Sequence, residues 1–546
     1  MKRIKRGEPP KRRDVDVGAL QAIVERGKTQ PLSPDDYDQL KSAVETLAFL
    51  TAEIESKGSS IERLRYLLFG SKSEKASNVL GGDKTTTSKP RGNGKPRGAQ
   101  GQKKGHGKNG ASAYPGADKV HVRHPSLCGG AGCPGCTKGK VYPLQEPSTL
   151  LRVRGMAPLF ATLYSRDRLR CNLCGEVFTA PAPEGVGDRK YDETATSMVA
   201  LLKYGTGLPF NRIEKLQEGL GIPMPAATQW DLVHDAATKV MPAFDELVRE
   251  AAQGKVLHND DTSMKVLELL GERRADPFDD ELEGRTGVFT TGIVSTRDER
   301  LIALFLTGRK HAGENLKDVL AHRAAELPPP IQMSDALSRN APGDTPTLKA
   351  NCNSHGRRYF VNVVEDFPEE CRYVIETLGE VFHHDAIARR ESMSDDERLR
   401  FHQEKSKPLM DELDTWMSKQ IDEHIVEPNS GLGEAIEYMQ EHWDKLTLFL
   451  SVPGAPLDNN VVERALKKAI LHRKNALFYK TKNGARVGDA FMSLIYTTEL
   501  CGGSAFDYLV ALLRHHRELR ECPAAWTPWR YVETLAGIAT APGPLP

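Results

Sequence analysis

A run of strand-like segments beginning near Lys255 restricts the fold of this chain more than any other feature of the sequence. Lys255–His258 opens the first segment, and the β-rich segments Val288–Ser295 and Leu301–Leu306 follow it. A helix is expected over Gly313–Glu326, where three consecutive prolines end it, and Ile331–Asp335 reads as one more short strand. Three strands, a helix and a fourth strand predict an α/β domain.

This order of elements fits a ribonuclease-H-like α/β fold, which carries carboxylates on its first strand and at the end of its fourth. Asp260, or its neighbour Asp261, and Asp335 occupy those positions. A helix further along the chain supplies a third carboxylate in this fold, and Glu463 is placed to do so. Residues 366–450 are largely helical in pattern, so we expect an α-helical insertion before Glu463.

The segment Leu457–Phe478 predicts the helix that carries this glutamate. Asn460 can act as the N-cap with Glu463 at the third helical position, as in a capping box. Its apolar stripe consists of Val462, Leu466, Ala469 and Ile470, and the basic residues around it are Arg464, Lys467, Lys468, His472, Arg473 and Lys474. Glu463 is therefore either a capping residue on a solvated face or a metal-binding carboxylate on a surface that holds phosphates.

Two C-x-x-C pairs predict a zinc site. They are Cys133–Cys136 and Cys171–Cys174, separated by 34 residues. Four thiolates complete the tetrahedral coordination of one Zn²⁺, so the site is expected to be structural. Leu150–Val153 and Leu159–Arg168 read as strands between the pairs, which indicates a zinc ribbon, and Cys128 is an alternative to Cys133. The thiols, with no apolar run of membrane-spanning length and no signal peptide, favour a reducing, cytoplasmic location.

The first 117 residues have the composition of arms and linkers. Residues 1–32 form a basic arm, and residues 33–77 predict a helix in which leucine or isoleucine recurs every seven positions from Leu40 to Leu68. This pattern indicates either a short coiled coil that joins copies of the chain or an amphipathic helix packed on its own chain. Residues 78–117 form a polar, basic linker that suits a nucleic-acid backbone, although the chain as a whole balances 75 basic against 74 acidic residues.

Three helices are expected before the first strand, over Thr194–Tyr204, Asn211–Glu218 and Ala226–Ala237. The last two, joined by a turn that contains glycine, are typical of a DNA-reading helix-turn-helix or of a helical bundle. The domains predicted from the zinc module onward are a zinc-binding domain 118–185, a helix-turn-helix-like region 186–250, a catalytic domain 251–365 and 456–515, an insertion 366–455 and a tail 516–546.

Several motifs in fixed order carry a resemblance to a known family. They are LRYLLFGSKSEK at 64–75, the paired cysteines, LLKYGTGLPFNRIEKL at 201–216, LHNDDT at 257–262, QMSDALSRN at 332–340, NSHGRRYF at 353–360 and DNNVVERALK at 458–467, followed by HRKNALF. From about residue 60 to residue 515 the chain resembles transposases of the insertion-sequence-66 family.

The resemblance implies a DDE transposase with the triad Asp260, Asp335 and Glu463. The family register favours Asp260 over Asp261 as the first member. Such a triad holds two Mg²⁺ ions, cleaves the element's ends and joins the 3′-ends to target DNA. The basic residues expected to bind DNA phosphates are Arg357, Arg358, Arg464, Lys467, Lys468, Arg473 and Lys474.

The expected partners are double-stranded DNA, further copies of this chain and accessory proteins encoded by the same element, within the cytoplasm at the nucleoid. Two other functions remain open from the sequence. One is a DNA-binding relative that has lost catalysis, and the other is a stand-alone metal-dependent nuclease. Metal-dependent cleavage separates the first from a transposase, and joined 3′-ends exclude the second.

Overall fold

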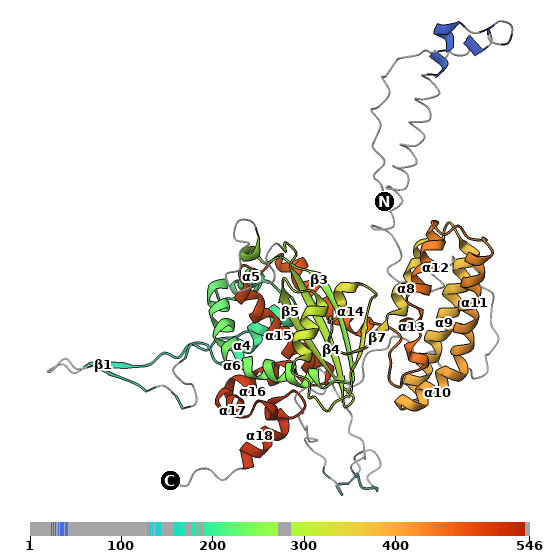
Figure 1. The fold of residues 1–546 in the computed structure, drawn as a ribbon. Helices are drawn as coiled ribbons and strands as arrows, with labels where there is room; N and C mark the ends of the chain where they lie inside the picture. Colours follow the sequence, from blue (N-terminus) through green and yellow to red (C-terminus); the bar gives the residue numbers. More distant parts are fainter. Residues whose placement is uncertain are drawn as a thin grey trace. The chain divides into compact units, whose positions relative to one another are not determined.

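The computed structural model describes residues 189–270 and 285–540 continuously, with parts of the segments 23–41 and 128–184 (Figure 1). The chain forms two compact units. One comprises residues 1–84, 355–393 and 400–441, and the other comprises 85–354, 394–399 and 442–546. Most of the predicted coiled coil, the whole linker 78–117 and the four paired cysteines lie outside the described residues.

A five-stranded mixed sheet is the centre of the larger unit. Its strands are β3 (Val256–Ser263), β4 (Phe289–Arg297), β5 (Arg300–Gly308), β6 (Ile331–Ser334) and β7 (Leu348–Asn351). They are ordered β5-β4-β3-β6-β7, with β3, β4 and β5 antiparallel and β6 and β7 parallel to β3. The predicted mixed α/β architecture is confirmed, and it is consistent with a ribonuclease-H-like domain.

Helices cover both faces of this sheet, so β4 is buried along most of its length and β5 through its middle. On one face, α14 (Asn460–Ala476) packs against β3 and β4. On the other face, α6 (Ala226–Ala252) and α7 (Ala312–Leu320) pack against β4. Asn315 of α7 donates a hydrogen bond to Thr291 Oγ1 on that second face.

The outer edge of β5 is closed by side chains of α15 (Lys482–Leu500). Asp489, Ser493 and Thr497 follow one another at four-residue intervals along this helix, so they lie on one face of it. They accept hydrogen bonds from the backbone N–H groups of Thr307, Phe305 and Ala303, at 2.7, 2.9 and 3.1 Å. The edge strand therefore has few backbone donors left for pairing with another strand.

The helices that precede the sheet follow the prediction with two changes. The first continues from α4 (Glu193–Ala200) into a π-helix, η2 (Leu201–Gly205), and the second is α5 (Phe210–Gly219). The third, α6, runs to Ala252 instead of ending at Ala237. It is longer because its buried apolar stripe continues against the sheet through Val240, Phe244 and Leu247.

Two further boundaries differ from the sequence prediction. The strand expected over Leu159–Arg168 instead begins at Arg168, where β1 (Arg168–Arg170) pairs with β2 (Val177–Thr179) in an antiparallel hairpin. The helix expected to reach Glu326 ends as α7 at Leu320. Beyond that end, Arg323 Nη1 donates to Ala252 O and Gly254 O, and these contacts draw the chain out of the helix.

The smaller unit contains most of the segment 366–455, which we expected to be a helical insertion. Its helices are α8 (Asn353–Asn362), α9 (Pro368–Arg390), α10 (Asp395–Lys405), α11 (Lys407–Asp422) and α12 (Gly431–Glu441), where α8 and α10 begin within the larger unit. Buried apolar side chains hold α9 and α11 together, among them Val374, Leu378 and Met417. Asp385, His402 and Ser406 add a buried polar cluster in which the Asp385 carboxylate accepts hydrogen bonds from Arg389.

The two ends of this insertion meet at one buried asparagine in the larger unit. Asn353 Nδ2 donates to Leu446 O at 2.9 Å and to Leu457 O at 3.2 Å, and its backbone N–H donates to Leu457 O at 3.0 Å. Leu446 is the last residue of α13 (Trp443–Leu446), which packs against β7. The chain segments before and after the insertion are therefore joined to each other beside the sheet.

The chain after α14 completes the larger unit. Helices α16 (Ala505–Arg514), α17 (His516–Glu521) and α18 (Tyr531–Thr540) follow α15. The core helix, glycine turn and new helix expected over Asp489–Tyr508 are present as α15, Gly502–Gly503 and the start of α16. A search of the described helices finds none with the length and apolarity that crossing a membrane requires.

Candidate active site

Adjacent aspartates on β3 point to opposite faces of the sheet. Asp260 is paired with Gly292 on β4, and cross-strand partners project to the same face. Gly292 faces α14, because a Cβ added there would lie 3.0 Å from the Leu466 side chain. Asp260 therefore projects on the side of the sheet that α14 covers, and the missing side chain at Gly292 lets that helix approach closely.

Glu463 projects from the first turns of α14, but its place in the helix differs from the prediction. The N-cap is Asn459, not Asn460, so Glu463 is the fourth helical residue and the expected capping box does not form. The Asn459 side chain is used elsewhere: its Nδ2 donates to Asn259 O on β3 at 3.1 Å. The side chain of the N-cap residue, Asn459, therefore makes a tertiary contact and does not cap the helix.

Asp335 follows the last residue of β6, the strand parallel to β3. Asn340 Nδ2 and the backbone N–H of Leu337 donate to its Oδ1. Asn351 Nδ2, at the end of β7, donates to its backbone carbonyl oxygen at 3.2 Å. Since parallel strands end at the same edge of a sheet, β6 brings Asp335 toward the part of β3 that carries Asp260.

The electrostatics of Asp260 couple it to the other carboxyl groups. Burial, and to a smaller extent the negative charges of Asp335, Asp261 and Glu463, raise the pKa of Asp260 to about 7, against a lowering hydrogen bond from the Asp261 N–H. A cluster of mutually repelling oxygen ligands is the donor set that hard divalent cations prefer. The residues present therefore fit a Mg²⁺ site.

Asp261 has a different set of partners. Its side chain is 1% exposed and lies 3.1 Å from His311 Nδ1 and 3.3 Å from Arg339 Nη2. His311 also packs on the ring of Phe289, with centroids 4.4 Å apart. We expected His311 to be an ordinary surface or core histidine. No local pattern links it to Asp261, which is 50 residues away in the chain.

A buried polar network joins the start of α14 to β3. Asn459 Oδ1 lies 3.1 Å from His258 Nδ1, and Asn459 N donates to Cys352 Sγ at 3.2 Å. Burial lowers the pKa of His258 to about 4, so the imidazole is neutral and its Nδ1–H donates to the amide oxygen. Next to His258, Asn259 Nδ2 donates to Asn340 O at 2.8 Å. One network therefore links the segments that carry all three carboxylates.

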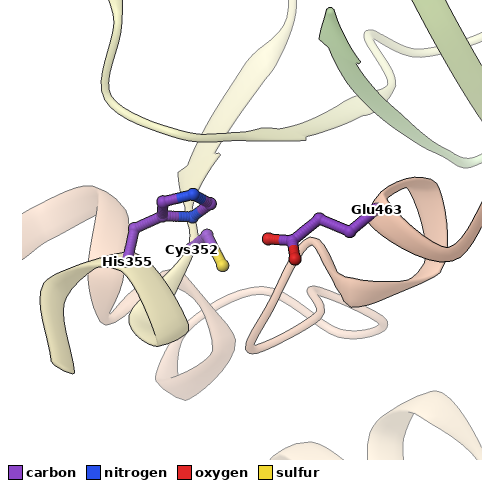
Figure 2. Close-up of side chains that lie close together, drawn as sticks. All are labelled: Cys352, His355 and Glu463. Atoms are coloured by element: carbon purple, nitrogen blue, oxygen red, sulfur yellow. The ribbon is translucent and has the colours of Figure 1, made fainter. Parts of the chain in front are cut away.

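Figure 2 shows Glu463 pointing from α14 toward Cys352, which directly follows β7. The thiol sulfur and a Glu463 carboxylate oxygen lie within 4.8 Å of each other. We expected Cys352 to be an ordinary thiol, since it lacks a C-x-x-C partner in the sequence. Its place beside Glu463 comes from the β7 strand, which the sequence analysis did not predict.

Comparison with known proteins identifies the family. The family model described as "Transposase IS66 family" matches residues 190–487, more than half of the chain. This chain belongs to the IS66 transposase family. Two relatives from Sinorhizobium fredii (strain NBRC 101917 / NGR234) bear the names uncharacterized protein y4hP and uncharacterized protein y4jD, and each is 26% identical to this chain. The matches cover 61% of both chains for y4hP, and 64% of this chain and 67% of the relative for y4jD.

In this member of the IS66 family, two of the α14 cations contact other residues of the same chain. Lys468 Nζ forms a 2.9 Å ion pair with Glu499, and Arg473 Nη1 donates to Ser263 Oγ at 2.7 Å and to Thr262 Oγ1. The other three α14 cations expected to bind phosphates, all exposed, are Arg464, Lys467 and Lys474. Arg357 and Arg358 lie on α8 within the helical unit.

The zinc ligands expected in the transposase, Cys133, Cys136, Cys171 and Cys174, lie outside the described residues. Cys128, the alternative ligand, is described and exposed. The zinc site therefore remains a prediction from the cysteine spacing.

Proposed function

We propose that this IS66-family chain is a DNA transposase that binds the ends of its element, cleaves them and joins the freed 3′-ends to target DNA. Asp260, Asp335 and Glu463 are its catalytic carboxylates and hold two Mg²⁺ ions. The observation that carries the proposal is the raised pKa of Asp260, to which burial and the charges of Asp335, Asp261 and Glu463 all contribute. Asp261 is left out of the triad because His311 and Arg339 contact its carboxylate.

The roles of the chain's own residues follow from their contacts. Two Mg²⁺ ions, when bound, supply activation of the attacking hydroxyl and stabilisation of the leaving oxygen. Asn340 and the Leu337 N–H orient the Asp335 carboxylate, and the buried Asn459 holds the start of α14, and with it Glu463, against β3. Each carboxylate is thus held by packed elements before DNA arrives, as a site for in-line displacement requires.

DNA contacts are assigned to exposed cations and to the helices before the sheet. Arg464, Lys467 and Lys474 would bind backbone phosphates beside Glu463, and Arg357 and Arg358 would do so from α8. Helices α5 and α6 would form the helix-turn-helix-like region. Because α6 buries one face against the sheet, only its exposed face is available to DNA.

The remaining parts of the proposal concern residues outside the described structure. Cys133, Cys136, Cys171 and Cys174 would hold one structural Zn²⁺, and the heptad helix would join copies of the chain so that two element ends meet. Accessory proteins of the same element are possible partners, and the protein would act in the cytoplasm at the nucleoid.

The experiment is cleavage and joining of labelled DNA that carries the element's own ends, with Mg²⁺. Wild type should cut and join, whereas Glu463→Gln should bind the DNA and leave it intact. Glu437→Gln removes the same charge from an exposed position on α12 and serves as the control. An active Glu463→Gln protein would contradict the triad.

The two alternative functions give different products in the same assay. Binding without cleavage by wild type, with any accessory proteins supplied, would identify a DNA-binding relative without catalysis. Cleavage with no joined 3′-ends would identify a nuclease.

A further inference from the structure

A cavity of about 520 Å³ lies at the end of β5, where that strand meets the first turns of α15. We infer that it binds a backbone phosphate of DNA at a position other than the one being cut. The inference rests on the proposed function, because it assumes that DNA runs past this end of the sheet.

Four cationic side chains line this cavity, which we term the β5 pocket. They are Arg309 and Lys310, which directly follow β5, and Lys482 and Arg486 from the first two turns of α15. Lys482 and Arg486 are four residues apart and so lie on one face of their helix. Two elements distant in sequence therefore each contribute two positive charges to one concave surface.

Acidic groups in and near the β5 pocket offset part of its positive charge. Asp489 also lines the cavity, but its two oxygens accept hydrogen bonds from Thr307 N–H and Thr307 Oγ1, both at 2.7 Å. Asp318 pairs with Lys310 at 2.8 Å, and Glu268 accepts a hydrogen bond from the Lys482 backbone N–H at 2.7 Å. The lining itself has four cationic side chains against one carboxylate, that of Asp489, so it keeps a cationic excess, which favours an anion.

The chemistry of these cations suits a phosphate. A guanidinium can bind two phosphate oxygens at once, and the pocket contains two guanidinium groups. Arg309 is 6% exposed, with Nη2 3.4 Å from Leu269 O, so its guanidinium is anchored by the surrounding chain. An anchored guanidinium beside the more exposed Arg486 loses less side-chain entropy on binding than two freely moving side chains would.

The sheet register places the β5 pocket near the triad without overlap. Asp260 pairs with Gly292, and Gly292 pairs with Phe305 on β5, two residues before Thr307. Neighbouring strands lie about 4.8 Å apart, so the pocket is roughly 10 Å across the sheet from β3, at the same end. The pocket lies on the opposite face from Asp260, because its lining includes Phe244 of α6 and Asn315 of α7, which cover the second face. A duplex that runs past this end of the sheet can therefore place its scissile phosphate at Asp260 and another phosphate, a few nucleotides away, in the pocket.

The test compares Arg486→Gln and Lys482→Gln with Arg520→Gln, which removes an exposed charge from α17 outside the pocket. Binding of a duplex bearing one element end is measured for the full-length proteins across a range of salt concentrations. Each pocket variant should weaken binding severalfold and lower the slope of log K against log[salt] by about one. Arg520→Gln should keep the wild-type slope, and unchanged melting temperatures would exclude misfolding as the cause.

A second measurement locates the phosphate. Single phosphates of the duplex are replaced by uncharged methylphosphonates, one at a time. One substitution away from the cleavage position should weaken binding by wild type and have no further effect on Arg486→Gln. If every substitution weakens both proteins equally, or if Arg520→Gln behaves as the pocket variants do, the inference is wrong.

Inorganic phosphate distinguishes a free anion from DNA. If inorganic phosphate stabilises wild type but not Arg486→Gln against heat, while their DNA binding has the same salt slope, the pocket binds a free ion and the DNA assignment is overturned. These binding measurements need no cleavage. A chain that binds as predicted but never cuts contradicts the proposed function alone, whereas a cutting chain with unchanged slopes contradicts only this inference.

Discussion

Asp260 is the side chain on which function and stability conflict. A buried carboxyl beside three other acids is destabilised when ionised, and its pKa of about 7 expresses that cost. The pKa is raised in the folded protein, so Asp260 favours folding most at low pH. That contribution is lost as pH rises from about 4, the ordinary aspartate value, through about 7. Above pH 7 and without metal, Asp260 is ionised in the folded protein and is repelled by the neighbouring carboxylates.

Asp260→Asn should therefore raise the melting temperature of the metal-free protein above pH 7, by about 2 °C or more, while abolishing cleavage. Below pH 4 the two proteins should melt at similar temperatures, because Asp260 is then neutral in both states. Thermal denaturation across pH in the presence of a chelator measures this. An Asp260→Asn protein less stable than wild type at pH 8 would contradict a strained carboxylate.

The sequence could name the acidic positions but could not fully separate Asp260 from Asp261. An alternation of period two shows that the two face opposite ways, and only the neighbours on each face show which one meets Asp335 and Glu463. Gly292 and Leu466 mark one face, and His311 and Arg339 mark the other. Those contacts join residues from 50 to 174 positions apart, which no local pattern reveals.

Helix α14 depends on β3 for its position as much as on its own sequence. Its N-cap residue, Asn459, donates a side-chain hydrogen bond to β3. Its buried apolar side chains pack against β4 at Gly292, which has no side chain. Local capping rules predicted the helix correctly and its first residue within one position. They did not predict the cap, because Asn459 gains a buried hydrogen bond to β3 that a solvated cap would lack.

Asn459→Ala should cost roughly 1–3 kcal/mol of stability, since it leaves buried polar groups on His258 and Asn259 without their partner. It should also lower the rate of cleavage while DNA binding is retained. Urea denaturation and single-turnover cleavage measure the two effects. Asn460→Ala, one residue further into the helix, is the control and should change both much less.

Gly292→Val should displace α14 from the sheet, because the added Cβ would meet Leu466 at 3.0 Å and Val462 at 3.2 Å. We expect a loss of about 1–3 kcal/mol in stability and a sharp fall in cleavage. The matched variant Gly308→Val adds the same side chain at a glycine whose Cβ would meet nothing within 4 Å. Equal losses for both would contradict the close approach.

Strands β3 to β6 could be predicted because apolar and β-branched residues recur in each. The fifth, β7, has the sequence LKAN and carries no such signal. It is a strand because β6 offers a parallel partner, with Ser334 opposite Asn351. Cys352 lies beside Glu463 only because β7 pairs with β6. Because the sequence of β7 does not predict a strand, it does not predict the position of Cys352 either.

The predicted zinc site can be tested on the whole protein through its metal content. Purified protein should contain one zinc ion per chain, and Cys133→Ser or Cys171→Ser should lose it, as measured by elemental analysis. Cys352→Ser should retain the zinc, because that thiol lies beside Glu463 and not in a C-x-x-C pair. A zinc content that all three substitutions leave unchanged would contradict the four-thiolate site.

Asn353 has a consequence for how such a chain can change over evolutionary time. Because Asn353 stands at one end of the insertion and binds carbonyl groups at the other end, the roughly ninety residues between Asn353 and Leu446 form a loop whose closure is already fixed by the core. The entropy of closing a loop grows only slowly with its length. Relatives can therefore lengthen, shorten or exchange the inserted helices at little cost to the sheet, and an engineered chain could carry a different domain at the same point.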